Sequence, residues 1–343
     1  MKAVIANVVR VGLDLGKTLV RVHAVDERGK RVVGRDIRRD VLLEWAAELP
    51  PGCLVAMEAS CGAHHLANEL RAIGLDARLV PSSSAVPYRL GGRSAKNDAT
   101  DAEAICEACS RPTMRFVPAK TPEQLAWLAV HRLREGYVAD RTAWINRARG
   151  LVFEFGIDLP RSVERFEGAM EQLLLAPTLP SRLKEGLRRV RSHFRETQRQ
   201  INWCDRQIDL HVRTDVNAAK AMTVRGVGPL SASALAASLG NMTQFRNGRQ
   251  LSAFLGLVPK QNSSGGITRL GSITKRGDPY LRRLLVLGAR AALFSRTRTP
   301  DPVAAWATQL KERVGAPKAI VALARRNSRI LWRLLARDGA PSA

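Results

Sequence analysis

The sequence lacks the features of membrane and secreted proteins. Its 343 residues contain no apolar run of about 18 residues, which a transmembrane helix requires. The first segment, MKAVIANVVRVGLDLG, is apolar but is interrupted by Arg10 and Asp14 and has no small-residue cleavage site, so no signal peptide is expected. The five cysteines lack the spacing of a disulfide framework. We therefore expect a cytoplasmic protein without a membrane partner.

The cysteines do not predict a zinc site either. Cys106 and Cys109 form a C-x-x-C pair, but no second pair or nearby histidine supplies the other ligands. We expect both to be small buried side chains. The chain has no internal repeat and no low-complexity tract, and its apolar content of 45% is enough for the cores of two or three domains.

Acidic residues are scarce compared with basic ones. The chain has 31 Asp and Glu against 55 Lys and Arg, a formal net charge of +24. The imbalance is strongest in residues 260–343, which hold 17 basic and four acidic residues. Such a surplus predicts a polyanionic partner, because each cation placed on a phosphate releases condensed counterions.

Apolar periodicity predicts three parts. In residues 1–150, three closely spaced strand patterns are followed by alternating strands and helices, which predicts a mixed sheet in an α/β layer fold. Residues 151–215 form a helical, coiled-coil-like connector, and residues 216–343 form a small, basic, mostly helical domain. The helix pattern after residue 181 has a thin apolar stripe, typical of a solvated hairpin arm or of a dimer contact. The stripe consists of Leu183, Leu187, Val190, Phe194, Ile201 and Ile208.

Four acidic residues in the first third predict a metal site. Asp14 lies within the first predicted strand and Glu58 ends the fourth, while Asp98 and Asp101 share one face of a predicted helix at i, i+3 spacing. Four such carboxylates can hold two Mg²⁺ ions for phosphoryl transfer. The simpler interpretation is that Asp98 caps the helix and Asp101 favours its dipole.

Two glycine-containing segments offer phosphate contacts. GLDLGKT, residues 12–18, is also compatible with the phosphate turn of an actin-like kinase. Residues 221–240 predict a helix, a tight turn at Gly226 and Gly228, and a second helix, resembling a helix-hairpin-helix. With the neighbouring Arg225, this turn is either a nucleic-acid contact or a simple corner between helices.

A serine in the last domain is a possible nucleophile. Ser263 and Ser264 precede two glycines in a loop surrounded by basic residues, but no histidine lies nearby to accept a proton. Taken alone, Ser-Ser-Gly-Gly is more often a turn. The basic residues expected to contact nucleic acid here are Arg269, Lys275, Arg276, Arg282 and Arg283.

These motifs, in their order, resemble the RuvC-like DEDD transposases of the insertion-sequence 110 family, related to the Piv invertases. VGLDLGKT, AMEAS and KNDATDAEAI resemble the acidic segments of the family, and RGVGPLSASALAASLG and FLGLVPKQNSSGGITRLGSITKRGDPYLRRLL resemble its C-terminal transposase domain. The resemblance covers nearly the whole chain. One departure is MEASCGAHH in place of EATGGY, which removes an aromatic residue beside Glu58.

The resemblance implies a ribonuclease H-like catalytic domain and a site-specific DNA recombinase. Asp14, Glu58, Asp98 and Asp101 would bind Mg²⁺, and Ser264, with Ser263 as the alternative, would form a covalent phosphoserine linkage in a composite site shared between subunits. It further implies donor and target DNA, a structured non-coding bridge RNA as guide, dimers that pair into tetramers, and action at the bacterial nucleoid.

Three other functions remain open at this point. A metal-dependent nuclease such as a Holliday junction resolvase would use the carboxylates with water and would not need the serine. An actin-like kinase would require an adenosine pocket in the C-terminal half, where the sequence offers basic helices instead. A non-catalytic nucleic-acid-binding scaffold would not need the four acids.

Overall fold

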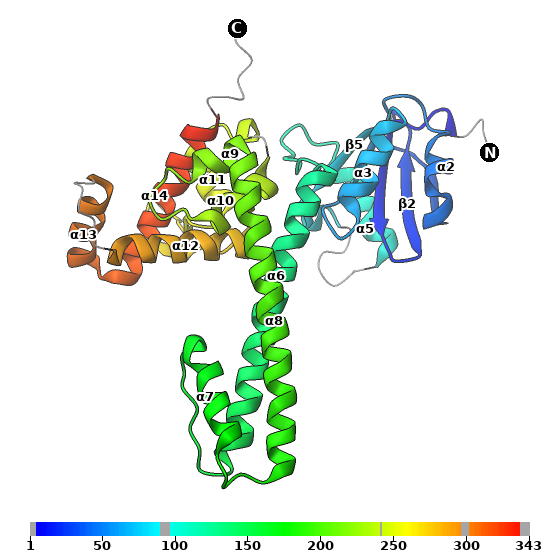
Figure 1. Cartoon of the computed structure of the whole chain (residues 1–343). Helices are drawn as coiled ribbons and strands as arrows, with labels where there is room; N and C mark the ends of the chain where they lie inside the picture. Colours follow the sequence, from blue (N-terminus) through cyan, green and yellow to red (C-terminus); the bar gives the residue numbers. More distant parts are fainter. Residues whose placement is uncertain (1–4, 90–96, 241, 296–301, 337–343) are drawn as a thin grey trace. The chain divides into compact units, whose positions relative to one another are not determined.

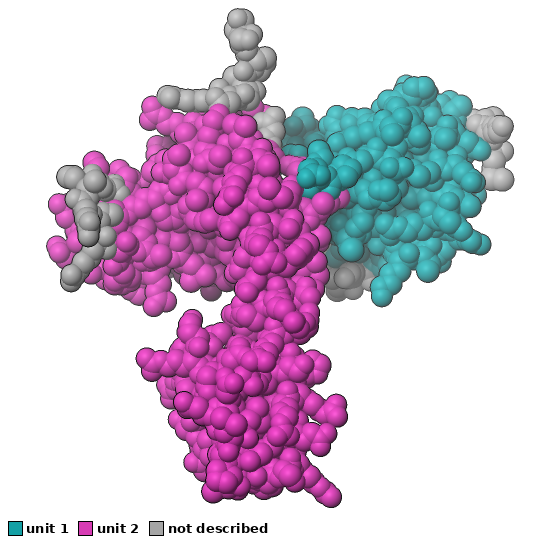
Figure 2. All heavy atoms as spheres, viewed as in Figure 1, with its two compact units in different colours: residues 1–123 teal, residues 124–343 magenta. Residues whose placement is uncertain are grey.

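A computed structural model describes residues 5–89, 97–240, 242–295 and 302–336 (Figure 1). The chain divides into two compact units, residues 1–123 and 124–343 (Figure 2). The boundary falls at the start of the long helix α6 (Pro122–Phe153). The three-part division at residues 150 and 215 stays a prediction. None of the helices in the described ranges has the length and apolar content needed to cross a membrane.

Unit 1 is built on a five-stranded mixed sheet, which confirms the α/β prediction. The strands are β1 (Arg10–Leu15), β2 (Leu19–Val25), β3 (Arg31–Arg38), β4 (Leu54–Glu58) and β5 (Asp76–Val80). Their spatial order is β3-β2-β1-β4-β5. The first three strands pair antiparallel, because short turns join them, whereas β4 and β5 follow helical crossovers and pair parallel.

Helices cover both faces of the sheet. Alternate residues of β1 point to opposite faces, so Val11 and Leu13 enter a core with α2 (Leu42–Ala46) and α3 (Ala63–Ala72). On the other face, Ala56 and Val80 pack with Ile105 of α5 (Asp98–Ala108). The short helices α4 (Ser82–Ala85), η1 (Arg39–Val41) and η2 (Val86–Tyr88) complete the unit.

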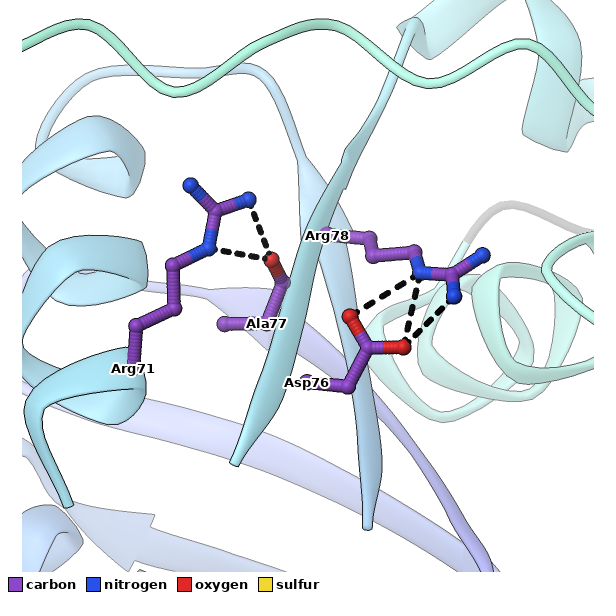
Figure 3. A network of polar contacts seen from close by, with 4 residues as sticks. All are labelled: Arg71, Asp76, Ala77 and Arg78. Atoms are coloured by element: carbon purple, nitrogen blue, oxygen red, sulfur yellow. Dashed lines mark hydrogen bonds and ion pairs between the residues drawn. The ribbon is translucent and has the colours of Figure 1, made fainter. Parts of the chain in front are cut away.

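The edge strand β5 is held by arginines. Arg71, at the end of α3, donates to the Ala77 carbonyl from Nε and Nη2 at 2.9 and 2.6 Å (Figure 3). On the strand itself, Arg78 donates to both carboxylate oxygens of Asp76. The first contact ties α3 to the sheet, and the charged pair makes the edge unfavourable for pairing with another strand.

Unit 2 begins with a helical hairpin. Helix α6 runs beside α8 (Ser181–Thr214), and α7 (Val163–Leu175) packs near their far end (Figure 1). Five of the six residues of the expected stripe are buried and Leu183 is partly buried, so the stripe is used within the chain. Two stacked pairs join α6 to α8, Trp127 on His211 and Trp144 on His193, each with ring centroids 4.3 Å apart.

The rest of unit 2 is a helical domain with its own core. Its helices are α9 (Val216–Ala221), α10 (Pro229–Leu239), η4 (Met242–Gln244), α11 (Gly248–Phe254), α12 (Pro279–Phe294), α13 (Pro302–Val314) and α14 (Ala316–Ala336). A two-stranded hairpin, β6 (Pro259–Gln261) and β7 (Leu270–Ile273), lies between α11 and α12 in sequence. The predicted mostly helical C-terminal region is therefore confirmed.

Candidate active site

Helix α5 approaches β1 closely because residue 12 is a glycine. A Cβ atom at Gly12 would lie 2.2 Å from the Ala102 carbonyl oxygen and 2.6 Å from the Cys106 nitrogen, both in α5. Residues 12 and 14 of β1 point to the same face of the sheet, so the glycine brings the helix onto the face where Asp14 lies. Cys106 and Cys109 are buried, as expected.

The strand register places Asp14 beside Glu58. Strands β1 and β4 pair parallel up to Leu13 opposite Met57, and the next residues along the two strands are Asp14 and Glu58. Both carboxylates therefore lie at the carboxyl ends of adjacent strands, on the face covered by α5.

Helix α5 contributes the other two carboxylates from its first turns. Its N-cap is Asn97, whose side chain accepts a hydrogen bond from the Thr100 N–H at 2.9 Å. The interpretation of Asp98 as the capping residue was therefore wrong by one position. Because the cap is supplied by a neutral side chain, neither Asp98 nor Asp101 is needed to satisfy the end of the helix.

The four acids act on one another electrostatically. Burial raises the pKa of Asp14 to about 6, and the charges of Asp101, Asp98 and Glu58, in that order, contribute to the increase. A hydrogen bond from the Leu15 backbone works in the opposite direction. The strand register and the packing of α5 on β1 place the four acids on the same face of the sheet, near enough for the other three charges to act on Asp14. We call these four residues the acidic cluster.

One member of the acidic cluster already has a cationic partner. Nε of Arg89 forms an ion pair with Oδ1 of Asp101, and the two side chains are 10% and 12% exposed. Neither of these two buried atoms makes a hydrogen bond within the described part of the chain. A buried ion pair without full hydrogen bonding recovers only part of its desolvation penalty. Arg89 therefore offsets part of the negative charge of the acidic cluster but does not complete the hydrogen bonds of its buried atoms. Its pairing with Asp101 was not predicted from the sequence.

The acidic cluster fits a divalent cation in chemistry and charge. Carboxylate oxygens are the donors that hard divalent cations prefer, and the mutual repulsion is relieved when a cation lies between them. In the described ranges, however, no three His, Cys, Asp or Glu side chains converge tightly enough to hold one ion. Arg89 competes with a cation for this cluster, because it is paired with Asp101.

The predicted nucleophile lies at the tip of the β6–β7 hairpin in unit 2. Gly265 and Gly266 both have positive φ, 55° and 76°, and the Ile267 N–H donates to the Ser264 carbonyl at 3.0 Å. These values are typical of a tight turn that requires glycine. Ser264 is exposed, while the hydroxyl of Ser263 accepts a hydrogen bond from Gln261 at 3.0 Å. A serine on such a tip is accessible to a DNA phosphate.

Three of the arginines predicted to contact nucleic acid also make contacts inside unit 2. Arg225 donates to the carbonyls of Ala292 and Ser295 at the end of α12. Arg282 donates to the Leu255 and Arg276 carbonyls, and Arg283 forms an ion pair with Glu135.

Of the two glycines in the predicted turn, one packs inside unit 2 and the other does not. Gly226, with φ of 83°, packs against α12, because a Cβ there would lie 2.7 Å from the Gly288 carbonyl. Gly228 borders open space at the start of α10. Arg269, Lys275 and Arg276 are exposed and make no ion pair within the described residues. The structure therefore leaves these three side chains and Gly228 available to a ligand.

Comparison with known proteins gives the family. A transposase model matches residues 11–156, and the model described as "Transposase IS116/IS110/IS902 family" matches residues 218–304. A Pseudomonas aeruginosa protein named "Probable family 20 transposase" is 45% identical and covers 97% of this chain and 98% of its own length. The transposase for insertion sequence element IS1111A of Coxiella burnetii is 37% identical and covers 96% of this chain and 90% of its own length. The transposase for insertion sequence element IS1328 of Yersinia enterocolitica is 35% identical and covers 95% of this chain and 96% of its own length. The chain therefore belongs to the IS116/IS110/IS902 family of insertion-sequence transposases and is a DNA transposase enzyme.

Proposed function

We propose that the transposase cuts and rejoins DNA through a phosphoserine intermediate, with Ser264 as nucleophile and the acidic cluster as the site of two Mg²⁺ ions. The observation that carries the proposal is that Asp14 and Glu58 lie side by side on β1 and β4, on the face of the sheet covered by α5, whose first turn holds Asp98 and Asp101. We assign this unit to the RuvC-like, ribonuclease H-like folds. When bound there, divalent cations supply Lewis acidity that stabilises negative charge on the reacting phosphate.

The serine step balances as a transesterification. The Ser264 oxygen forms a bond to phosphorus, the bond from phosphorus to one deoxyribose oxygen breaks, and that oxygen leaves as a hydroxyl after taking a proton. Attack by a hydroxyl of another strand on the phosphoserine reverses the step and releases the serine. The proton of Ser264 must go to a base outside the hairpin, because residues 259–273 contain neither a carboxylate nor a histidine. We assign this role to a carboxylate of unit 1, from the same or another copy of the chain.

The proposed partners follow from the charge of the chain and its family. A net charge of +24 favours polyanionic partners, and we assign these as donor and target DNA and, by the resemblance to the family, a structured non-coding guide RNA. Base pairing through such an RNA would supply sequence selection that backbone contacts do not provide. A dimer that pairs into a tetramer would bring the acidic cluster of one copy to the serine of another. The proposed compartment is the bacterial cytoplasm, with action at the nucleoid.

Ser264→Ala tests the chemistry against its alternative. A labelled donor-end DNA is incubated with full-length enzyme and Mg²⁺ and is separated on a denaturing gel. We expect Ser264→Ala to lose both strand cleavage and the covalent protein–DNA adduct by at least about 10³-fold, which is the scale of losing a nucleophile.

Ser263→Ala is the matched control, because it removes a hydroxyl from the same hairpin. It should retain adduct formation within a few-fold of wild type. Cleavage by Ser264→Ala without an adduct would instead identify a resolvase-like nuclease that uses water, and adduct loss confined to Ser263→Ala would move the nucleophile to Ser263.

A further inference from the structure

Unit 2 contains a large groove apart from the hairpin tip that carries the serine. Its volume is roughly 1430 Å³, and its walls come from α11, α14, Trp306 of α13 and strand β7. Strand β7 belongs to the same hairpin as Ser264, so one wall of the groove is continuous with the proposed nucleophile's loop. We call this cavity the α14 groove.

The α14 groove is lined by charges of one sign only. Its charged lining residues are Arg249, Lys318, Arg325, Arg326, Arg329 and Arg333. No Asp or Glu is among the residues that line it, and none of the six cations forms an ion pair within the described ranges. Six unneutralised cations around one cavity repel one another, which is unfavourable unless an anion is bound there. The charge pattern therefore points to a polyanion.

The cations are arranged for an extended ligand rather than for a single phosphate. Lys318, Arg325, Arg329 and Arg333 recur at intervals of seven, four and four residues, which places them along one face of α14. The opposite face is buried against the core through residues such as Leu323 and Leu331. The 15 helical steps from residue 318 to residue 333 span about 22 Å at 1.5 Å per residue, comparable with about six nucleotides of one DNA strand.

Several groups of the groove are fixed before any ligand binds. The Arg326 guanidinium lies over the Trp306 ring, 4.6 Å from its centroid, and Trp332 donates from Nε1 to the Phe245 carbonyl at 2.9 Å. Nε of Arg325 is buried and lacks a hydrogen-bond acceptor among the described residues. A buried guanidinium nitrogen without an acceptor is costly, and a phosphate oxygen would satisfy it.

We propose, building on the function above, that the α14 groove binds the backbone of one DNA strand next to the phosphate that Ser264 attacks. The groove holds the strand through Arg325, Arg329 and their neighbouring cations, and the hairpin wall leads the strand to the serine. The groove contacts the phosphates and not the bases, so binding is independent of the DNA sequence.

The test compares two double variants of the full-length chain. Arg325→Gln/Arg329→Gln removes two charges from the groove, and Arg290→Gln/Arg313→Gln removes two exposed charges that do not line it. Binding to a labelled 12-nucleotide DNA strand is measured by fluorescence anisotropy in EDTA at several salt concentrations. We expect the groove variant to bind about tenfold or more weakly and its slope of log K against log salt to fall in magnitude by about 1.4, corresponding to two lost phosphate contacts.

The control variant should bind within about twofold of wild type. Equal losses in both variants would overturn the proposal, since they would show a diffuse charge effect. Unchanged binding by the groove variant would also overturn it, as would a marked preference for an RNA strand of the same sequence.

Two further readouts keep this test independent of the serine. Ser264→Ala should bind the strand as tightly as wild type, so failure of the serine mechanism does not mimic failure of the groove. Far-ultraviolet circular dichroism and melting temperature should match wild type for both double variants, because the substituted side chains lie on surfaces that are at least partly exposed.

Discussion

The acidic cluster of unit 1 and the α14 groove of unit 2 both gather charges of one sign, but they differ in how the fold compensates them. In the acidic cluster, Arg89 is paired with Asp101, and the pKa of Asp14 is raised to about 6, so a proton is readily taken up. In the groove, the lining cations have no carboxylate partner among the described residues.

The difference lies in what pairs with the charges. Within the acidic cluster, Asp98 is exposed and the other three acids are partly buried, and the fold supplies an internal cation at Asp101 and a raised pKa at Asp14, where solvent screening is weakest. Cations that line the groove are only partly screened by water and salt, and arginine is never neutralised by deprotonation, so their repulsion persists until an anion binds. The cluster is thus adapted to exchange a small cation, whereas the groove is adapted to exchange counterions for a polyanion.

The largest change to the acidic cluster should come from a substitution that moves α5 away from β1. Gly12→Ala would place a methyl group within 3 Å of the Ala102 carbonyl and the Cys106 backbone, which cannot move aside without shifting the helix. We expect a loss of about 3 kcal/mol in the unfolding free energy of unit 1, at the upper end of overpacking effects. A shift of about 1 Å in Asp98 and Asp101 should reduce strand cleavage by about 100-fold.

Gly150→Ala is the control for this substitution. Gly150 lies within helix α6, and a Cβ atom added there would meet no neighbouring segment within 4 Å, so alanine should stabilise the chain by about 0.5–1 kcal/mol. Urea unfolding and cleavage assays of both variants give the comparison. Wild-type cleavage by Gly12→Ala would mean that close packing of α5 on β1 is not required for the site.

Lowering the pH should stabilise unit 1 through Asp14 and destabilise unit 2 through His131. The pKa of Asp14 is raised in the folded state. Between about pH 4 and 6, Asp14 is therefore protonated in the folded state but ionised in the unfolded state. Its contribution to the stability of unit 1 is lost as the pH rises through 6. His131 in unit 2 is buried between Tyr280 and Ser233, and burial lowers its pKa to about 4. Its contribution is lost as the pH falls from about 6.5 to 4, by about 3 kcal/mol.

Hydrogen exchange read by mass spectrometry can follow each unit separately between pH 4 and 7. Asp14→Asn should stabilise unit 1 at pH 7 by about 1 kcal/mol, allowing for solvent screening, and by almost nothing at pH 4. Burial also lowers the pKa of His23 in unit 1, but this background is shared by wild type and variant. A pH-independent effect of Asp14→Asn would contradict the electrostatic coupling of the four acids.

The sequence was sufficient for the parts of the molecule that depend on local patterns. Strand and helix periods predicted the mixed sheet, the long helices and the stripe that includes Leu187 and Phe194, because burial imposes those periods. The positions of Asp14 within the first strand and of Glu58 at the end of the fourth could be predicted for the same reason. The cap of α5 was assigned one residue too late, since Asn97 and Asp98 are both good capping residues.

The missed features depend on contacts between distant segments. Nothing in the sequence near Arg89 shows that it meets Asp101, because the ion pair forms only when α5 packs on the sheet. The use of Arg225 and Arg282 within unit 2 likewise depends on carbonyls distant in sequence. The α14 groove did leave a local signal, a row of cations on one helix face from Lys318 to Arg333, but its partner Arg249 comes from another helix.

Divalent-cation binding by the acidic cluster is tested most directly by isothermal titration with Mn²⁺, without DNA. Wild type should bind Mn²⁺ and Asp14→Asn should bind at least about tenfold more weakly, because a charged ligand is lost. Arg89→Gln is the matched variant: it removes a competing cation and should bind several-fold more tightly, at some cost in the stability of the metal-free protein. Equal Mn²⁺ affinity in wild type and Asp14→Asn, or weaker binding by Arg89→Gln, would contradict a cation site among these four carboxylates.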